Sequence, residues 1–216
     1  MTAGASSGTT LIGLLLAAGR GSRFSADGSA NKLMAVLAGR PVCVAAAASL
    51  QAALPRVAAA VPASSSAAAG VLAQAGCEVV ACDRASEGMG ATLAQAVASL
   101  SRQYAGAGDP LPAWCVMPAD MPWVHPDTIA ALRDAWLALP PSRRGRAVLA
   151  PVYRGMRGNP VLLGPDWTDG LTQLRGDEGA RRLIAGHVTP IEVSDPGCLR
   201  DVDTPQDLDA GPTQLA

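Results

Sequence analysis

The chain has 216 residues, which is enough for one well-buried domain and short for two. Hydrophobic residues make up 49% of it and aromatic residues only 3%, so its core must consist mainly of alanine, valine and leucine. A formal net charge of −1 excludes the basic excess of a protein that binds the nucleic-acid backbone, and no apolar run approaches the roughly 18 to 20 residues of a membrane helix.

The cysteines and the amino terminus indicate the compartment. Five cysteines are scattered without a CxxC pair, which argues against both a disulfide framework and a zinc site. No lysine or arginine precedes the first apolar run, as it would in a signal peptide. We therefore expect a cytoplasmic protein that binds neither nucleic acid nor membrane.

Short apolar runs alternate with longer alanine-rich stretches from residue 10 onward. The runs predict strands over Leu11–Ala17, Arg56–Val61, Glu78–Cys82, Ala113–Met117, Ala147–Val152 and Ile191–Val193. Helices are expected over Pro41–Ala53, Ser64–Ala75, Gly90–Gln103, Asp127–Ala138 and Asp177–Ala185. Continuous apolar strands predict a mostly parallel, Rossmann-like sheet in a three-layer α/β/α fold, which binds ligands beyond the carboxyl ends of its strands. We expect one domain over residues 10–210, a disordered tail over 1–9 and a C-terminal tail over 211–216.

A glycine-rich segment follows the first expected strand. Glycines let main-chain amides approach a phosphate, and three basic side chains in and after the segment supply positive charge. A dinucleotide fingerprint fails because Phe24 occupies the third glycine position, and a Walker A loop fails because Asn31 precedes Lys32. A plain glycine turn with solvated charges is the alternative to a phosphate site. The segment reads Leu16-Ala17-Ala18-Gly19-Arg20-Gly21-Ser22-Arg23-Phe24, followed by Asn31-Lys32-Leu33.

A carboxylate lies just beyond the fourth expected strand, in Val116-Met117-Pro118-Ala119-Asp120. This position shares the sheet edge with the glycine-rich segment. Mg²⁺ prefers one or two carboxylates and completes its shell with water and phosphate oxygens, so Asp120 is a candidate metal ligand. The alternative is that Asp120 caps a turn before the helix near Pro126.

These residues resemble the signature of the nucleotidyltransferases that activate molybdopterin, and the resemblance runs from Leu14 to about Leu208. It implies a fold of the nucleotide-diphospho-sugar transferase type and a Mg²⁺ cofactor. Ser25 departs from the family, which has glycine there, and the spacer before Lys32 is longer than in the family. The resemblance implies that the nucleotide is bound by Leu16, Ala17, Ala18, Gly19, Arg20, Gly21, Ser22, Arg23 and Lys32, with Arg23, Lys32 and Asp120 as the catalytic residues.

Further family elements occur in the second half of the chain. Asp201-Val202-Asp203-Thr204-Pro205 resembles the D-x-D-T-P element, which implies that Asp203 is a second metal ligand, with Asp201 behind it. Residues 157–160 and 176–181 resemble the family's R-G-[HN]-P and G-D-E-G-A-R elements, which implies that Asn159, Asp177 and Glu178 contact the acceptor. Helix capping by Asp203, a turn at Asn159 and acids at a helix start are the ordinary explanations of these residues.

The segment after the third expected strand contains Gly88 and Gly90, whose backbone would contact base and ribose in this family. The start of a helix explains the same glycines, and the residues leave both explanations open. The L-A-A-G sequence ending at Gly19 matches the cytidylyl branch of the family, whereas the guanylyl branch has L-A-G-G. The methyl group of Ala18 would narrow the base pocket and favour a pyrimidine.

The resemblance implies transfer of CMP from CTP to molybdopterin, with release of pyrophosphate. A molybdenum hydroxylase would receive the product. Three alternatives stay open: GTP as the donor, another small phosphorylated acceptor, and a protein that only carries the molybdenum cofactor.

Overall fold

A computed structural model describes residues 9–18, 24, 31–177 and 179–209 of the chain. All but residue 9 of the two predicted tails lie outside these residues. Gly19, Arg20, Gly21, Ser22, Arg23 and Glu178 lie outside them as well, so the predictions for these side chains remain predictions.

One sheet organises the described part of the chain, in the order β10-β7-β9-β6-β1-β4-β5, with β8 paired to β7. β1 lies between β4 and β6 and is parallel to both, whereas β9 is antiparallel to β6 and to β7. The strands are β1 (Leu11–Leu16), β4 (Val57–Pro62), β5 (Glu78–Cys82), β6 (Ala113–Pro118), β7 (Val148–Tyr153), β8 (Met156–Arg157), β9 (Val161–Leu163) and β10 (Val188–Glu192). A separate antiparallel pair joins β2 (Val36–Leu37) to β3 (Arg40–Pro41).

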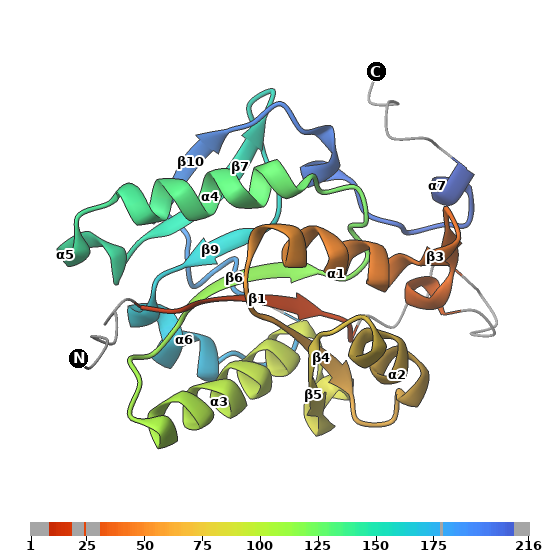
Figure 1. Cartoon of the computed structure of the whole chain (residues 1–216), viewed down its shortest axis with the longest axis horizontal. Coiled ribbons are helices and arrows are strands. Elements are labelled where there is room, and N and C mark those ends of the chain that lie inside the picture. Colours follow the sequence, from red (N-terminus) through yellow and green to blue (C-terminus); the bar gives the residue numbers. More distant parts are fainter. Residues whose placement is uncertain (1–8, 19–23, 25–30, 178, 210–216) are drawn as a thin grey trace, which may run out of the picture.

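Helices cover both faces of the sheet, with α1 and α4 on one side and α3 and α6 on the other (Figure 1). None of the described helices combines the length and apolarity needed to cross a lipid bilayer. The α-helices are α1 (Val42–Ala53), α2 (Ser66–Gln74), α3 (Met89–Ala107), α4 (Pro126–Ala138), α5 (Pro141–Arg144), α6 (Thr168–Thr172) and α7 (Gln206–Asp209). Short 3₁₀ helices are η1 (Lys32–Met34), η2 (Asp83–Glu87), η3 (Pro165–Trp167) and η4 (Pro196–Leu199).

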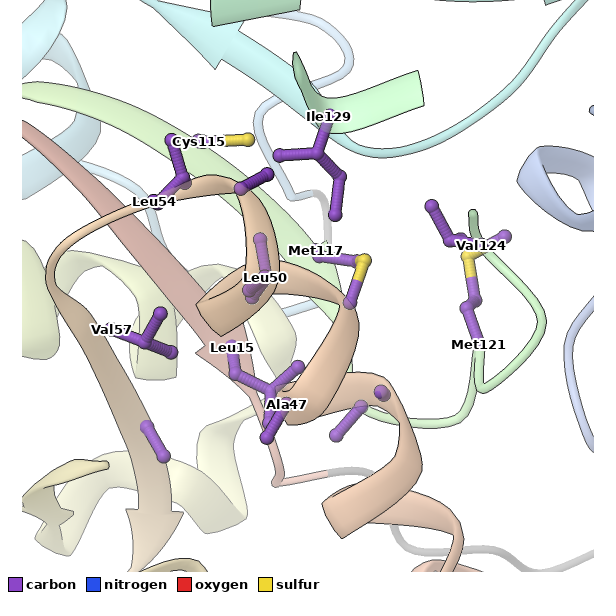
Figure 2. Packing of buried hydrophobic residues seen from close by; sticks show 14 of the residues in the cluster. Leu15, Ala47, Leu50, Leu54, Val57, Cys115, Met117, Met121, Val124 and Ile129 are labelled. Atoms are coloured by element: carbon purple, nitrogen blue, oxygen red, sulfur yellow. The ribbon is translucent and has the colours of Figure 1, made fainter. Parts of the chain in front are cut away.

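The core forms two layers because successive side chains of a strand point to opposite faces. All six residues of β1 are buried. Leu15 faces α1, where it packs beside Ala47 and Leu50 (Figure 2). Leu14 belongs to the opposite layer, with Leu93 of α3. Burial on both faces explains why β1 reads as a continuous apolar run, and it confirms the predicted three-layer α/β/α fold.

The principal difference from the predicted elements lies at Asp177–Ala185, where we expected a helix. The described residues there form consecutive turns. Gly176 and Gly179 have φ angles of 57° and 37°, which a right-handed helix does not contain. The prediction of a helix was therefore wrong, because the helical pattern ignored the conformation of these glycines.

Candidate active site

The carboxyl ends of β1 and β6 form the edge at which the candidate residues meet. Leu16 and Pro118 are partners in the register of the two strands. The amide of Ala119 donates to the carbonyl oxygen of Leu16 at 3.0 Å, and the amide of Val202 donates to that of Asp120 at 2.8 Å. Through these bonds, a segment from the far end of the chain is held against the loop that follows β6.

Lys32 lies at this edge and is paired with two of the predicted metal ligands. Its Nζ atom is 2.6 Å from Oδ2 of Asp120 and 3.2 Å from Oδ1 of Asp203. The residue is only 7% exposed. Asn31 fixes the start of η1, because its Oδ1 accepts a 3.0 Å hydrogen bond from the amide of Leu33. The three predicted residues Lys32, Asp120 and Asp203, far apart in sequence, thus form one cluster.

Electrostatics in the cluster favour the charged form of Lys32. Burial lowers the pKa of Lys32, but hydrogen bonds and charges of Asp120 and Asp203 outweigh it and leave this pKa above its ordinary value. The pKa of Asp201 is also raised, by loss of hydration and then by the charges of Asp203 and Asp120. The site therefore favours the protonated ammonium of Lys32, and its negative charges disfavour ionisation of Asp201.

The donor set of this cluster fits a divalent cation. Asp120, Asp201 and Asp203 each offer a carboxylate oxygen, and these oxygens lie within 4.8 Å of one another. Hard cations such as Mg²⁺ and Mn²⁺ prefer oxygen donors of this type. The ammonium of Lys32 already places one positive charge against two of the three carboxylates. The predicted ligands Asp120 and Asp203 are thus close enough to share a metal, with Asp201 beside them.

Asp207 orients the segment that carries Asp203, and the sequence prediction missed it. Its Oδ2 atom accepts hydrogen bonds from the amides of Asp203 at 3.0 Å and Thr204 at 2.6 Å, and from Oγ1 of Thr204 at 2.9 Å. Partial burial raises the pKa of Asp207, but the hydrogen bonds from Thr204 and Asp203 outweigh it and lower this pKa. The sequence pattern that indicates this role is a capping box, in which a threonine is followed three residues later by an acid.

A cavity of about 950 Å³ extends along the same edge on the face covered by α3. Leu16 and Pro118, at the carboxyl ends of β1 and β6, line it, and so do the predicted acceptor residues Asn159 and Asp177. Its lining is partly apolar and partly basic. The apolar lining residues include Leu93, Val116, Val161, Leu163 and Ile184, and the basic ones are Arg157, Arg181 and Arg182. The sequence prediction missed these arginines as candidates, although Arg157 and Arg181 stand in the two motifs assigned to the acceptor.

Gly88 and Gly90 contact the predicted acceptor turn. The amide of Gly90 donates to the carbonyl oxygen of Gly176 at 2.8 Å, and the amide of Met89 donates to Oδ1 of Asp177 at 3.3 Å. The amide of Gly88 donates to Ala85. These amides are engaged within the protein, so the observed bonds correspond to the start of α3, and a contact with base and ribose remains a prediction.

The described part of the nucleotide segment is mostly buried. Leu16 and Ala17 are 8% and 2% exposed, and the amide of Ala17 donates to the carbonyl oxygen of Ala60 at 2.8 Å. Ala18 is half-buried. Ala18 packs against the core layer on the α3 face of the sheet.

Solved structures share this architecture. Rv0371c from Mycobacterium tuberculosis has a TM-score of 0.69 at 23% identity, with 93% of this chain and 97% of that chain covered, and it is also solved in complex with manganese. A nucleotidyl transferase from Methanothermobacter thermautotroptrophicus has a TM-score of 0.72 at 22% identity, over 93% and 94% of the two chains. CMP:2-keto-3-deoxy-manno-octonic acid synthetase, in complex with CTP, has a TM-score of 0.61 at 13% identity, over 93% and 96%. The fold is that of the nucleotidyltransferases.

The sequence shows the family as well. Residues 13–191 match the MobA-like NTP transferase domain, which takes up most of the chain. The chain belongs to this family and is a nucleotidyltransferase-type enzyme. A comparison with curated proteins finds no match.

Proposed function

We propose that the protein transfers CMP from CTP to a molybdopterin-type acceptor and releases pyrophosphate. The observation that carries this proposal is the cluster of Lys32, Asp120 and Asp203 at the carboxyl end of β1. β1 is the strand after which the glycine-rich part of the family signature follows in the sequence. Binding of a triphosphate requires positive charge, which a buried ammonium and a cation held by several carboxylates would both supply.

In the proposed reaction, a phosphate oxygen of the acceptor attacks the α-phosphorus of CTP in line. A new P–O bond forms, the bond between the α-phosphorus and the bridging oxygen breaks, and pyrophosphate leaves. The acceptor needs no general base, because a phosphate monoester with a second pKa near 6 is largely ionised at neutral pH. Lys32 and Arg23 would stabilise the charge on the phosphate oxygens.

The metal would be held by Asp120 and Asp203, with Asp201 beside them. Bound Mg²⁺ would supply positive charge that neutralises the triphosphate and orients it for displacement. The positions of the three carboxylates support this assignment, because their oxygens are close enough to serve one ion.

The cavity beside the cluster supports an acceptor with a phosphate and a ring system. Its apolar lining residues would contact a flat ring, and Arg157 and Arg181 would pair with phosphate. Asn159, Asp177 and Glu178 are the proposed polar contacts to the acceptor. Delivery of the product to a molybdenum hydroxylase, in the cytoplasm, completes the proposal.

The test measures pyrophosphate release with each of the four nucleoside triphosphates, in Mg²⁺, with and without molybdopterin. We expect release only with CTP and molybdopterin together. Preference for GTP would replace the cytidylyl assignment with the guanylyl one. Tight binding of molybdenum cofactor without pyrophosphate release from any triphosphate would contradict the enzymatic proposal.

A further inference from the structure

Lys32 is the only lysine in the sequence, and the other side chains counted as Lys or Arg are all arginines. The two residues differ chemically: a guanidinium is a planar fork of five donors, whereas an ammonium is a compact point charge. A lysine is rarely buried without a partner, and Lys32 is 7% exposed. The only lysine side chain therefore occupies a buried position beside the carboxylates of Asp120 and Asp203.

The oxygens that hold Lys32 belong to the carboxylates that would bind a metal. Nζ contacts Oδ2 of Asp120 at 2.6 Å and Oδ1 of Asp203 at 3.2 Å. Asp120 and Asp203 are two of the three residues in the carboxylate group. A divalent cation bound by both residues would carry two positive charges into contact range of the ammonium, so the two cations would repel each other strongly.

We propose that the ammonium of Lys32 and a divalent cation compete for the carboxylates of Asp120 and Asp203, and that a triphosphate relieves this competition by giving Lys32 another anionic partner. The triphosphate part rests on the proposed function, whereas the competition does not. An ammonium that loses its carboxylates inside the protein loses the charge that compensates its desolvation. Metal binding to the free protein is therefore weak, and metal and triphosphate each raise the affinity for the other by the same factor.

This arrangement has a chemical use. A site whose carboxylates are neutralised internally does not trap a metal ion before the substrate arrives. The single lysine also keeps three mutually repelling carboxylates together in the free protein, because it supplies positive charge where Asp120 and Asp203 approach. Lys32 is thus a counter-ion in the free protein and a phosphate ligand in the loaded one.

The first test measures Mn²⁺ binding to the full chain by electron paramagnetic resonance, without nucleotide. We expect Lys32→Met to bind Mn²⁺ at least about tenfold more tightly than the wild type. Arg84→Met is the matched control, because this substitution also removes one positive charge from the protein. Arg84 is exposed and pairs with Glu87. Its affinity should equal that of the wild type. Affinity of Lys32→Met within twofold of the wild type would overturn the competition.

The second test uses the wild type, so it stands even if Lys32→Met fails to fold. Selective ¹⁵N labelling of lysine gives a single ε-ammonium NMR signal, which reports on Lys32 alone. We expect this signal to change during an Mg²⁺ titration with the half-saturation measured for the metal, which is obtained by displacing Mn²⁺. Saturation by Mg²⁺ with an unchanged signal would overturn the proposal.

A third measurement separates the two parts of the proposal. Addition of CTP should tighten Mn²⁺ binding to the wild type by at least about tenfold. An unchanged Mn²⁺ affinity would overturn the role of the triphosphate and leave the competition standing. Failure of the separate pyrophosphate assay, with both binding results as expected, would count against the proposed transfer reaction alone.

Discussion

Gly88 and Asp177 lie so close together that a β-carbon on Gly88 would fall 2.2 Å from Oδ1 of Asp177. The same β-carbon would lie 2.5 Å from the carbonyl carbon of Gly176. Gly88 also has a φ angle of 124°, in the region that favours glycine. The start of α3 and the turn at residues 176–177 therefore form one closely packed unit on the wall of the cavity.

The substitution Gly88→Ala should destabilise the protein and displace the turn at Asp177. We expect a loss of about 1–3 kcal/mol in the free energy of unfolding, from backbone strain and the steric conflict. Gly106→Ala is the matched control in the same helix, because an added β-carbon there meets no atom within 4 Å. It should be neutral or stabilising by up to about 1 kcal/mol. Equal urea midpoints for the two variants would contradict this packing.

Replacement of Lys32 by alanine should abolish most turnover while leaving the fold recognisable by circular dichroism. We expect kcat to fall by about 10²–10³-fold, as when one preorganised donor to a developing oxyanion is removed. The measurement is steady-state pyrophosphate release, with exposed Arg84→Ala as a control that keeps wild-type turnover. Turnover of Lys32→Ala within about tenfold of the wild type, roughly 1.4 kcal/mol, would exclude a direct role for its ammonium.

Asp207 should act on the metal through Asp203. In Asp207→Ala, the amides of Asp203 and Thr204 lose their acceptor, so the segment loosens. We expect a loss of stability of about 1 kcal/mol, typical of a removed helix cap, together with weaker Mn²⁺ binding. Asp207→Asn, which keeps one acceptor oxygen, should lie between Asp207→Ala and the wild type. Unchanged Mn²⁺ affinity in both variants would reduce Asp207 to a local cap.

Alkaline pH should destabilise the protein through its buried thiols. Burial raises the pKa of Cys43, Cys82 and Cys198 to about 11 and that of Cys115 to about 12. The ordinary pKa of a thiol is 9, so above pH 9 the unfolded chain loses these protons while the folded chain keeps them. The stability that is present below pH 9 is therefore lost as the pH rises to 11. Within this window each thiol lowers the free energy of unfolding by about 1.4 kcal/mol per pH unit.

The urea midpoint measured from pH 7.5 to 10 checks this loss. A midpoint that stays constant up to pH 10 would show that the thiols are not protected in the folded state. At pH 8, the thiols of the native protein should also resist a disulfide reagent that labels all of them after denaturation.

Donor choice should depend on Ala18, the half-buried residue at the end of the described nucleotide segment. Under the proposed function, Ala18→Gly removes the methyl group that narrows the base pocket. We expect the ratio of kcat/KM for CTP to that for GTP to fall by about tenfold, the discrimination that one methyl-sized group provides. The two donors are compared at fixed acceptor concentration, and an unchanged ratio would place donor selection elsewhere.

The sequence predicted the parts of the fold that periodicity controls. β5 was predicted at its observed bounds. β1 and β4 were predicted within one residue at each end, because buried parallel strands read as unbroken apolar runs. β9 was missed because three residues carry too little pattern to distinguish a strand from a turn. The helix predicted over Asp177–Ala185 was wrong because positive φ angles at glycine are set by the fold.

The candidate site was predicted in its residues but not in its pairings. Asp120, Asp203 and Lys32 were each selected from separate motifs, and the structure brings all three together. The salt bridge from Lys32 to Asp203 spans 171 positions in sequence, and no local pattern reports such a contact. Capping by Asp207 was readable, since a threonine followed by an acid three residues later is a local signal.

The antiparallel direction of β9 places the connection between β7 and β9 at this edge of the sheet, where its residues can change independently of the other strands. Because β9 runs against β7, the chain turns back at the carboxyl end of β7, and Met156, Gly158 and Asn159 of this return segment line the cavity. Mutations in this return segment reshape one wall of the cavity while β1 and the loop after β6 keep their connections. Under the proposed function, substitutions in this one hairpin would change the acceptor while leaving the cluster of Lys32, Asp120 and Asp203 in place.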